Sequence, residues 1–167
     1  ILELSRISRQ ELRRVRVDLS QIAAELIDEL ARSEPGCRCD FVLAQGCVAT
    51  GDPQLLRIVL QNLLENAWKY SAKVAFPRIE FGSEMGRCET TYFVRDNGVG
   101  FDMKYADRLF APFQRLHRPE EFEGTGIGLA TVARVVHRHG GRIWAESAPG
   151  KGATFHFTLG QASGKSP

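Results

Sequence analysis

The sequence predicts an α/β domain in which a mixed β-sheet is covered on one face by helices. Segments with helical periodicity and segments with strand alternation are mixed along the chain, without the strict alternation typical of a doubly wound parallel sheet. The chain has 167 residues, of which 43% are apolar and 25% are charged, so it can bury the core of one domain. No stretch approaches the roughly 20 apolar residues of a membrane span.

The first third of the chain predicts two helices and one or two short strands. Residues 1–17 are helical in composition and resemble the tail of a longer helix. A second helix begins at Asp18, which forms a capping-box pair with Gln21, and it ends before Pro35 and Gly36. One or two strands follow within residues 39–51.

The middle of the chain predicts a long helix followed by two strands. Asp52 caps this helix and Pro53 occupies its first position, and the helix runs to about Ser71. The segments "RIEFGS" and "CETTYFVRD" then alternate and contain aromatic and β-branched residues, as strands do.

The last third predicts a helix and a pair of strands after a long stretch without periodicity. The helix spans about residues 127–139 and ends at Gly140 and Gly141. Strands at "RIWAES" and "ATFHFTL" flank the turn "APGKG". We expect residues 18–160 to form the domain and residues 161–167 to be a disordered tail.

Charge and cysteine content exclude some classes of protein. The net charge is +2 and the basic residues are scattered among acids, so nucleic acid is not an expected partner. The four cysteines lack a regular framework and the spacing of zinc ligands, which favours a reducing, cytoplasmic compartment. The full-length protein could still be anchored in a membrane.

The long central helix carries a polar stripe beside its apolar one. Asn62, Asn66 and Lys69 follow each other at spacings of four and three residues, which places them on one face of the helix. Amide oxygens suit Mg²⁺, which shares its ligand shell with substrate phosphates, and the lysine could meet the phosphate charge. Alternatively, the asparagines are ordinary solvent-facing residues.

A first glycine-containing motif, "DNGVGFD", directly follows the aromatic strand. Asp96 could point into a pocket and accept a hydrogen bond from an exocyclic amine, while Gly98 and Gly100 allow the backbone to approach a flat ring. Because Asn-Gly is also a strong turn signal, a simple hairpin is the alternative.

A second motif, "GTGIGLA", opens the last helix, where free amide groups and the helix dipole attract anions. It lacks the flanking features of a dinucleotide fingerprint and the lysine of a P-loop. Residues 103–123, between the motifs, could form a nucleotide lid or a plain surface loop. Such a lid would be anchored by Phe110, Phe113 and Phe122 and would carry the cations Arg115 and Arg118.

In this order, the asparagine helix, "DNGVGF", the phenylalanine-flanked segment and "GTGIGLA" resemble the ATP-binding catalytic domain of sensor histidine kinases. The resemblance covers residues 18–159. It implies the α/β sandwich shared with gyrase, the MutL repair protein and the large heat-shock chaperone, in which three helices cover one face of a mixed sheet.

The resemblance also implies roles for individual residues. Asn62 and Asn66 would hold Mg²⁺, and Lys69 and Arg115 would reach the phosphates of ATP. Tyr70 would lie along the adenine and Asp96 would read its amino group, supported through water by Thr154. The phosphate chain would be cradled by the amides of Gly124, Thr125, Gly126, Ile127, Gly128 and Leu129.

The same resemblance separates a kinase from a hydrolase. Hydrolases of this superfamily place a water-activating glutamate where this chain has Asn62, and an amide cannot act as a general base near neutral pH. Glu65 is turned by about 100° from Asn66 on a helical wheel. We therefore expect a phosphotransferase, with a gyrase-like or MutL-like hydrolase and a non-catalytic nucleotide-binding regulator as alternatives.

The partners implied by the resemblance lie outside this chain. A histidine kinase transfers phosphate to a histidine on a preceding helical hairpin that also dimerises. Residues 1–17 would be the tail of the second helix of that hairpin, and none of the four histidines here lies in them. We expect that hairpin, from the same full-length protein, and a response-regulator receiver domain as partners. The isolated chain should be a monomer and the full-length protein a homodimer.

Overall fold

The computed structural model describes residues 11–112 and 128–160. Within these ranges no helix is both long and apolar enough to cross a membrane. In chain order the elements are β1 (Val15–Asp18), α2 (Leu19–Ser33), β2 (Asp40–Leu43), β3 (Val48–Gly51), α3 (Pro53–Ser71), β4 (Arg78–Met85), β5 (Thr90–Asp96), the 3₁₀ helix η1 (Met103–Arg108), α4 (Gly128–Arg138), β6 (Ile143–Ser147) and β7 (Ala153–Thr158).

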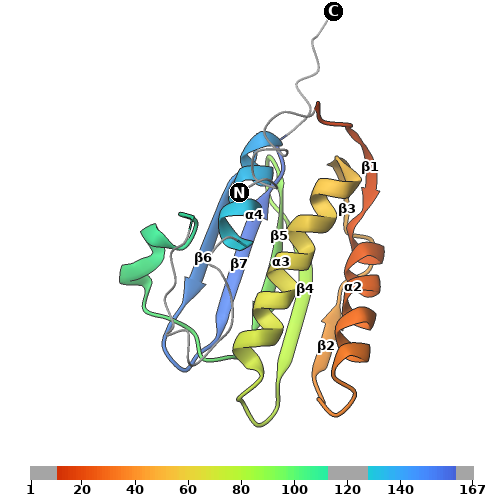
Figure 1. Cartoon of the computed structure of the whole chain (residues 1–167). Helices are drawn as coiled ribbons and strands as arrows, with labels where there is room; N and C mark the ends of the chain where they lie inside the picture. Colours follow the sequence, from red (N-terminus) through yellow and green to blue (C-terminus); the bar gives the residue numbers. More distant parts are fainter. Residues whose placement is uncertain (1–10, 113–127, 161–167) are drawn as a thin grey trace, which may run out of the picture.

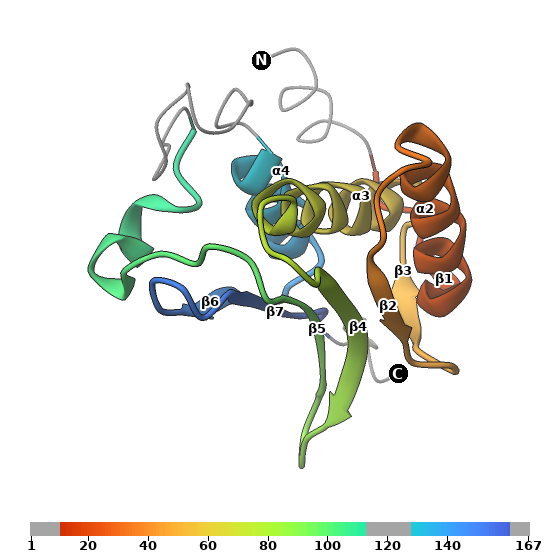
Figure 2. The same ribbon diagram turned by 90° about the horizontal axis from the view of Figure 1, so that it is seen from below.

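The main sheet has five strands in the order β2-β4-β5-β7-β6. Strand β2 runs parallel to β4, and every other pairing in this sheet is antiparallel. Helices α2, α3 and α4 lie side by side on one face of the sheet, as the two views in Figures 1 and 2 show. The predicted fold class, a mixed sheet covered on one face by helices, is confirmed.

Helix α3 forms the centre of the core between the sheet and the other two helices. Its apolar stripe is completely buried: Val59, Leu60 and Leu63 are 0% exposed. Phe81 on β4 and Phe157 on β7 form the sheet side of this core, and their side chains are 1% and 0% exposed. Each such side chain contributes about 2 to 3 kcal/mol through burial, which fixes the orientation of α3 and therefore of its polar stripe.

The predicted helix starts are confirmed by their caps. Asp18 Oδ1 accepts a hydrogen bond from the Gln21 amide, and Asp52 Oδ1 accepts bonds from the amides of Gln54 and Leu55. Helix α4 is followed by Gly140, whose φ of +78° favours glycine.

The end of the opening segment was predicted to be helical, and this prediction is wrong. Residues Val15–Asp18 form β1, which pairs antiparallel with β3 in a separate two-stranded ribbon. Val17 is only 4% exposed, so pairing and burial of β-branched residues override the helical composition of the segment. The domain therefore includes residues 15–17, which the composition of the opening segment assigns to the preceding helix.

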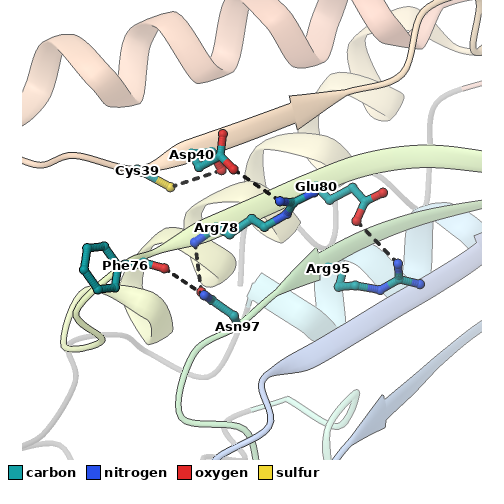
Figure 3. Close-up of polar contacts among 7 residues, drawn as sticks. All are labelled: Cys39, Asp40, Phe76, Arg78, Glu80, Arg95 and Asn97. Atoms are coloured by element: carbon teal, nitrogen blue, oxygen red, sulfur yellow. Dashed lines mark hydrogen bonds and ion pairs between the residues drawn. The ribbon is translucent and has the colours of Figure 1, made fainter.

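The face of the main sheet away from the helices, here called the outer face, carries a row of opposite charges. Figure 3 shows the cross-strand ion pairs Asp40–Arg78 and Glu80–Arg95, each with an N to O distance of 3.4 Å. Farther along this face, the rings of Trp144 stack on His156 with centroids 5.2 Å apart. These contacts allow the outer face to meet solvent without a covering layer.

Candidate nucleotide-binding site

The polar stripe of α3 faces the start of α4. The Asn62 Nδ2 group donates a hydrogen bond to the Ile58 carbonyl at 2.9 Å, and this bond directs Oδ1 outward. A Cβ atom added to Gly128, the first residue of α4, would lie 2.9 Å from Asn62 Oδ1. The structure therefore brings the two predicted site residues Asn62 and Gly128 into contact across two helices.

Asn66 and Lys69 continue this stripe toward the carboxyl end of α3, and both are half-buried. Lys69 Nζ lies 4.7 Å from the ring centroid of Tyr70. The Tyr70 carbonyl accepts a hydrogen bond from the Val99 amide at 3.0 Å. The end of α3 is thus joined directly to the "DNGVG" segment.

Asp96 is a buried carboxylate, 6% exposed, at the end of β5. Its Oδ1 atom accepts bonds from the amides of Gly98, at 2.8 Å, and Ala153, at 3.4 Å. Both of these amides, from described residues, donate to Oδ1. The other carboxylate oxygen, Oδ2, can therefore accept a hydrogen bond from a ligand. Burial raises the pKa of Asp96 to about 6, and the two amide bonds oppose this rise.

The glycines of this segment are required by contacts with the protein's own backbone. A Cβ at Gly98 would lie 2.2 Å from the Tyr70 carbonyl oxygen, and a Cβ at Gly100 would lie 2.1 Å from that of Ala148. Gly100 also has a φ of +64°. The alternative of a hairpin is wrong, because β5 pairs with β4 and β7 while the chain after Asp96 leads to η1.

Two side chains that the sequence did not single out hold this loop in place. Asn97 accepts from the Arg78 amide and donates to the Phe76 carbonyl, both at 2.8 Å (Figure 3). Ser147 accepts from the Phe101 amide at 2.9 Å and donates to the Gly152 carbonyl at 2.6 Å. These bonds connect the loop to β4 on one side and to the β6–β7 turn on the other.

Thr154 does not join Asp96. In the register of β5 and β7, Asp96 pairs with Ala153 and Arg95 pairs with Thr154. Because side chains alternate between faces, the Thr154 hydroxyl lies on the outer face, where it accepts from Arg95 Nε at 3.2 Å. The position that faces Asp96 is Ala153, which offers its amide but has no hydroxyl.

Part of the predicted lid and phosphate-binding segment lies outside the described residues. This holds for Phe113, Arg115, Arg118, Phe122, Gly124, Thr125, Gly126 and Ile127. Of the residues that are described, Phe110 packs edge-on against Phe155 with ring centroids 6.3 Å apart. Gly128 and Leu129 begin α4, and Leu129 packs against the core.

Comparison with known proteins identifies the family. A sequence model of the histidine kinase-, DNA gyrase B- and HSP90-like ATPases matches residues 51–163, more than half of the chain. The chain belongs to this ATPase family.

Several relatives in the family have curated names. Cyanobacterial phytochrome A of Nostoc sp. is 46% identical over 112 residues, which are 67% of this chain and 14% of that protein. The phytochrome-like protein Cph1 of Synechocystis sp. is 32% identical over 159 residues, 95% of this chain and 21% of that protein. The methanogenesis regulatory histidine kinase FilI of Methanothrix harundinacea is 44% identical over 100 residues, 60% of this chain and 11% of that protein. The chain thus spans only a small part of each relative.

Solved structures share the fold. The mycobacterial sensor histidine kinase MprB superposes with a TM-score of 0.71 at 22% identity, covering 88% of this chain and 97% of that one. Full-length ShkA in complex with AMPPNP gives a TM-score of 0.74 at 23% identity, covering 95% of this chain and 34% of that one. Histidine kinases of known structure therefore have the same arrangement of helices and sheet.

The residues on α3 fit a metal that is shared with a phosphate. Asn62 and Asn66 supply neutral amide oxygens, and the described residues hold no group of three or more His, Cys, Asp or Glu that could bind a metal without help. Mg²⁺ commonly takes few protein ligands and completes its shell with water and phosphate oxygens. In this ATPase family, such a donor set suits Mg-ATP better than a free ion.

Glu65 is not placed to activate water at this stripe. Its side chain is exposed and accepts a hydrogen bond from Gln61 Nε2 at 3.0 Å. It lines the groove between α2 and α3 together with Leu26 and Leu30, not the side of α3 that meets α4. At the end of the stripe that contacts Gly128, the chain has the amide of Asn62 instead of a carboxylate.

Proposed function

We propose that the chain is the ATP-binding catalytic domain of a sensor histidine kinase. It binds Mg-ATP and donates the γ-phosphate to a histidine on a helical hairpin of the same full-length protein. The observation that carries this proposal is the contact of Asn62 Oδ1 with the start of α4, at the position where a hydrolase needs a carboxylate.

In the proposed complex, each of these side chains contacts a different part of Mg-ATP. Asp96 accepts a hydrogen bond from the adenine amino group, and Asn62 and Asn66 hold Mg²⁺, which neutralises phosphate charge when bound. Lys69 and Arg115 add positive charge along the phosphates. Because phosphoryl transfer depends mainly on positioning and charge neutralisation, these groups suffice once an acceptor histidine is supplied.

The partners follow from this role. The phosphorylated hairpin would pass the phosphate to the receiver domain of a response regulator, and the full-length kinase would dimerise through the hairpin. We expect the isolated chain to sediment as a monomer at micromolar concentration. A dimer at that concentration would contradict this assignment.

The test is phosphate release from Mg-ATP measured beside a binding titration. The unchanged chain should bind Mg-ATP and release little phosphate. Asn62→Glu should gain turnover by supplying a general base, whereas the matched variant Asn62→Gln should not. Sustained release by the unchanged chain would show a hydrolase, and binding without any transfer to an added hairpin would show a nucleotide-binding regulator.

A further inference from the structure

His139, directly after α4, is a completely buried histidine with both ring nitrogens in use. It is 0% exposed. Its Nδ1 atom lies 2.8 Å from the Val135 carbonyl oxygen, and its Nε2 atom lies 3.1 Å from the Asp52 amide nitrogen. The ring therefore bridges the end of α4 and the start of α3, two helices that the nucleotide site also requires.

The backbone of β3 is shaped to receive this ring. A Cβ at Gly51 would lie 2.9 Å from His139 Nε2 and 2.8 Å from the Leu56 side chain. Any larger residue at position 51 would displace either the ring or the first turns of α3. The ring of His139 is therefore tightly packed against the backbone of Gly51, as is typical of a protein core.

The hydrogen bonds fix one protonation state. The Asp52 amide can only donate, so Nε2 must be unprotonated, and Nδ1 must carry the proton that it donates to Val135. Burial lowers the pKa of His139, and the charges of Arg14 and Arg138 lower it further. The Val135 bond and the charge of Asp52 act in the opposite direction.

Asp52 connects this ring to two further parts of the chain. Its Oδ1 caps α3 and its Oδ2 accepts from the Arg13 amide at 3.1 Å, while its own amide donates to His139. The entering chain, the start of α3 and the end of α4 therefore meet at one residue.

The opposite end of α4 is where Gly128 meets Asn62. Helix α4 is a continuous helix of 11 residues, so a shift at its carboxyl end displaces its start as well. We propose that His139 is a positioning residue, which fixes the axial position of α4 along α3 and thereby the distance between the start of α4 and Asn62. This inference rests on the proposed function only in one respect, namely that Mg-ATP binds where Asn62 meets the start of α4.

The test compares variants that keep or remove the bond to Asp52. His139→Leu retains an apolar volume but loses both polar contacts, while His139→Gln can still accept from the Asp52 amide and cannot be protonated near neutral pH. His137→Gln is the control, since His137 lies in the last turn of the same helix and is exposed.

The affinities for Mg-ATP and for adenosine together distinguish a positioning role of His139 from a general loss of folding. Binding of Mg-ATP uses the start of α4, whereas adenosine needs only the pocket at Asp96. We expect His139→Leu to weaken Mg-ATP binding about tenfold or more, with adenosine affinity changed less than about twofold, because small displacements at a site cost affinity steeply. The variants His139→Gln and His137→Gln should stay near the parent. Equal losses for both ligands, or no loss for Mg-ATP, would overturn the proposal.

A third readout does not depend on nucleotide. Amide hydrogen exchange at residues 132–135 of the nucleotide-free chain, whose amides bond to carbonyls in the first turn of α4, should be about tenfold faster in His139→Leu than in His139→Gln. If the parent binds no nucleotide, the proposed function fails, and this exchange rate still decides the role of His139 in holding α4. Equal rates in the two variants would refute that role.

If His139→Leu does not fold, the parent and His139→Gln suffice. The NMR signal of the Asp52 amide should show a pH-dependent step at the midpoint of the His139 ring in the parent, and this step should be absent in His139→Gln. An Asp52 signal that is insensitive to the ring's titration would contradict the bridge.

Discussion

The two faces of the sheet differ most at the end of β5, where neighbouring residues serve opposite purposes. On the outer face, Arg95 is exposed and pairs with Glu80, so each charge meets both an opposite charge and water. On the helix face, Asp96 is buried and bonded to backbone amides, and burial outweighs these bonds, so its pKa is raised. Because consecutive side chains of a strand lie on opposite faces, Arg95 forms a structural ion pair, whereas the next residue, Asp96, is suited to binding a ligand.

The largest expected effect is that of Asp96→Asn on nucleotide binding. Replacing the carboxylate removes a charged acceptor, and hydrogen bonds to charged groups contribute about 1.5 to 3 kcal/mol. ATP affinity in a calorimetric titration should therefore fall by roughly 10-fold to 100-fold. Glu80→Gln is the matched change on the outer face and should leave affinity unaltered. If both substitutions lowered ATP affinity equally, the helix face and the outer face would not differ in nucleotide binding.

The pH dependence of Asp96 should move stability and affinity in opposite directions. The pKa is raised from 3.8 to about 6 in the folded chain, so the folded state binds more protons than the unfolded state between these values. As pH falls through this window, Asp96 adds stability of up to about 3 kcal/mol. Affinity should fall over the same range, because the protonated group loses its acceptor character.

The measurement is chemical denaturation and ATP titration between pH 4.5 and 8, with Asp96→Asn measured in parallel. Subtracting the variant's curve removes the contribution of His139, whose lowered pKa makes stability fall below about pH 6.5. If stability and affinity still fall together after subtraction, Asp96 is not the titrating group.

A smaller effect is expected for Asn66→Ala, and it should depend on magnesium. Loss of one metal ligand should weaken Mg-ATP binding by about 1 to 2 kcal/mol, while binding of ATP in excess chelator stays the same. Stability should change by less than about 1 kcal/mol, since alanine favours helix. Gln61→Ala, at an exposed position of the same helix, controls for the change in helix propensity.

The smallest effect should come from Arg95→Ala on the outer face. The ion pair with Glu80 is exposed, and such pairs contribute about 1 kcal/mol or less. The guanidinium also lies 4.8 Å from the Phe93 ring centroid, a contact of similar size at exposed sites. Denaturation should report this modest loss, and ATP affinity should stay within about twofold. A large loss of affinity would show that the outer face is coupled to the site.

The parts of the fold that sequence predicted are those set by local chemistry. Helix α3 was placed correctly because Asp52 and Pro53 mark its start and an unbroken apolar stripe follows. Its polar stripe could be read for the same reason, since spacings of three and four residues define one face of a helix. The burial of Asp96 also agrees with its position at the end of an alternating strand.

The parts that failed depend on contacts between distant residues. Strand β1 exists because β3 pairs with it, and composition alone gave no sign of this partner. Thr154 was assigned to the wrong face because strand register, which a shift of one residue reverses, is not encoded locally. Likewise, Ser147 bonds to Phe101 across 46 residues, and His139 to Asp52 across 87, so neither role was visible in the sequence.

The pairing of β1 with β3 also determines where the molecule can bend. Four residue pairs hold β1, and the Arg13 amide is bonded to Asp52 just before it. From Arg13 onward the chain is therefore part of the rigid body that carries α3. Under the proposed function, β1 and α3 would therefore move together when the nucleotide approaches an acceptor, and β1 would not be the hinge of that movement.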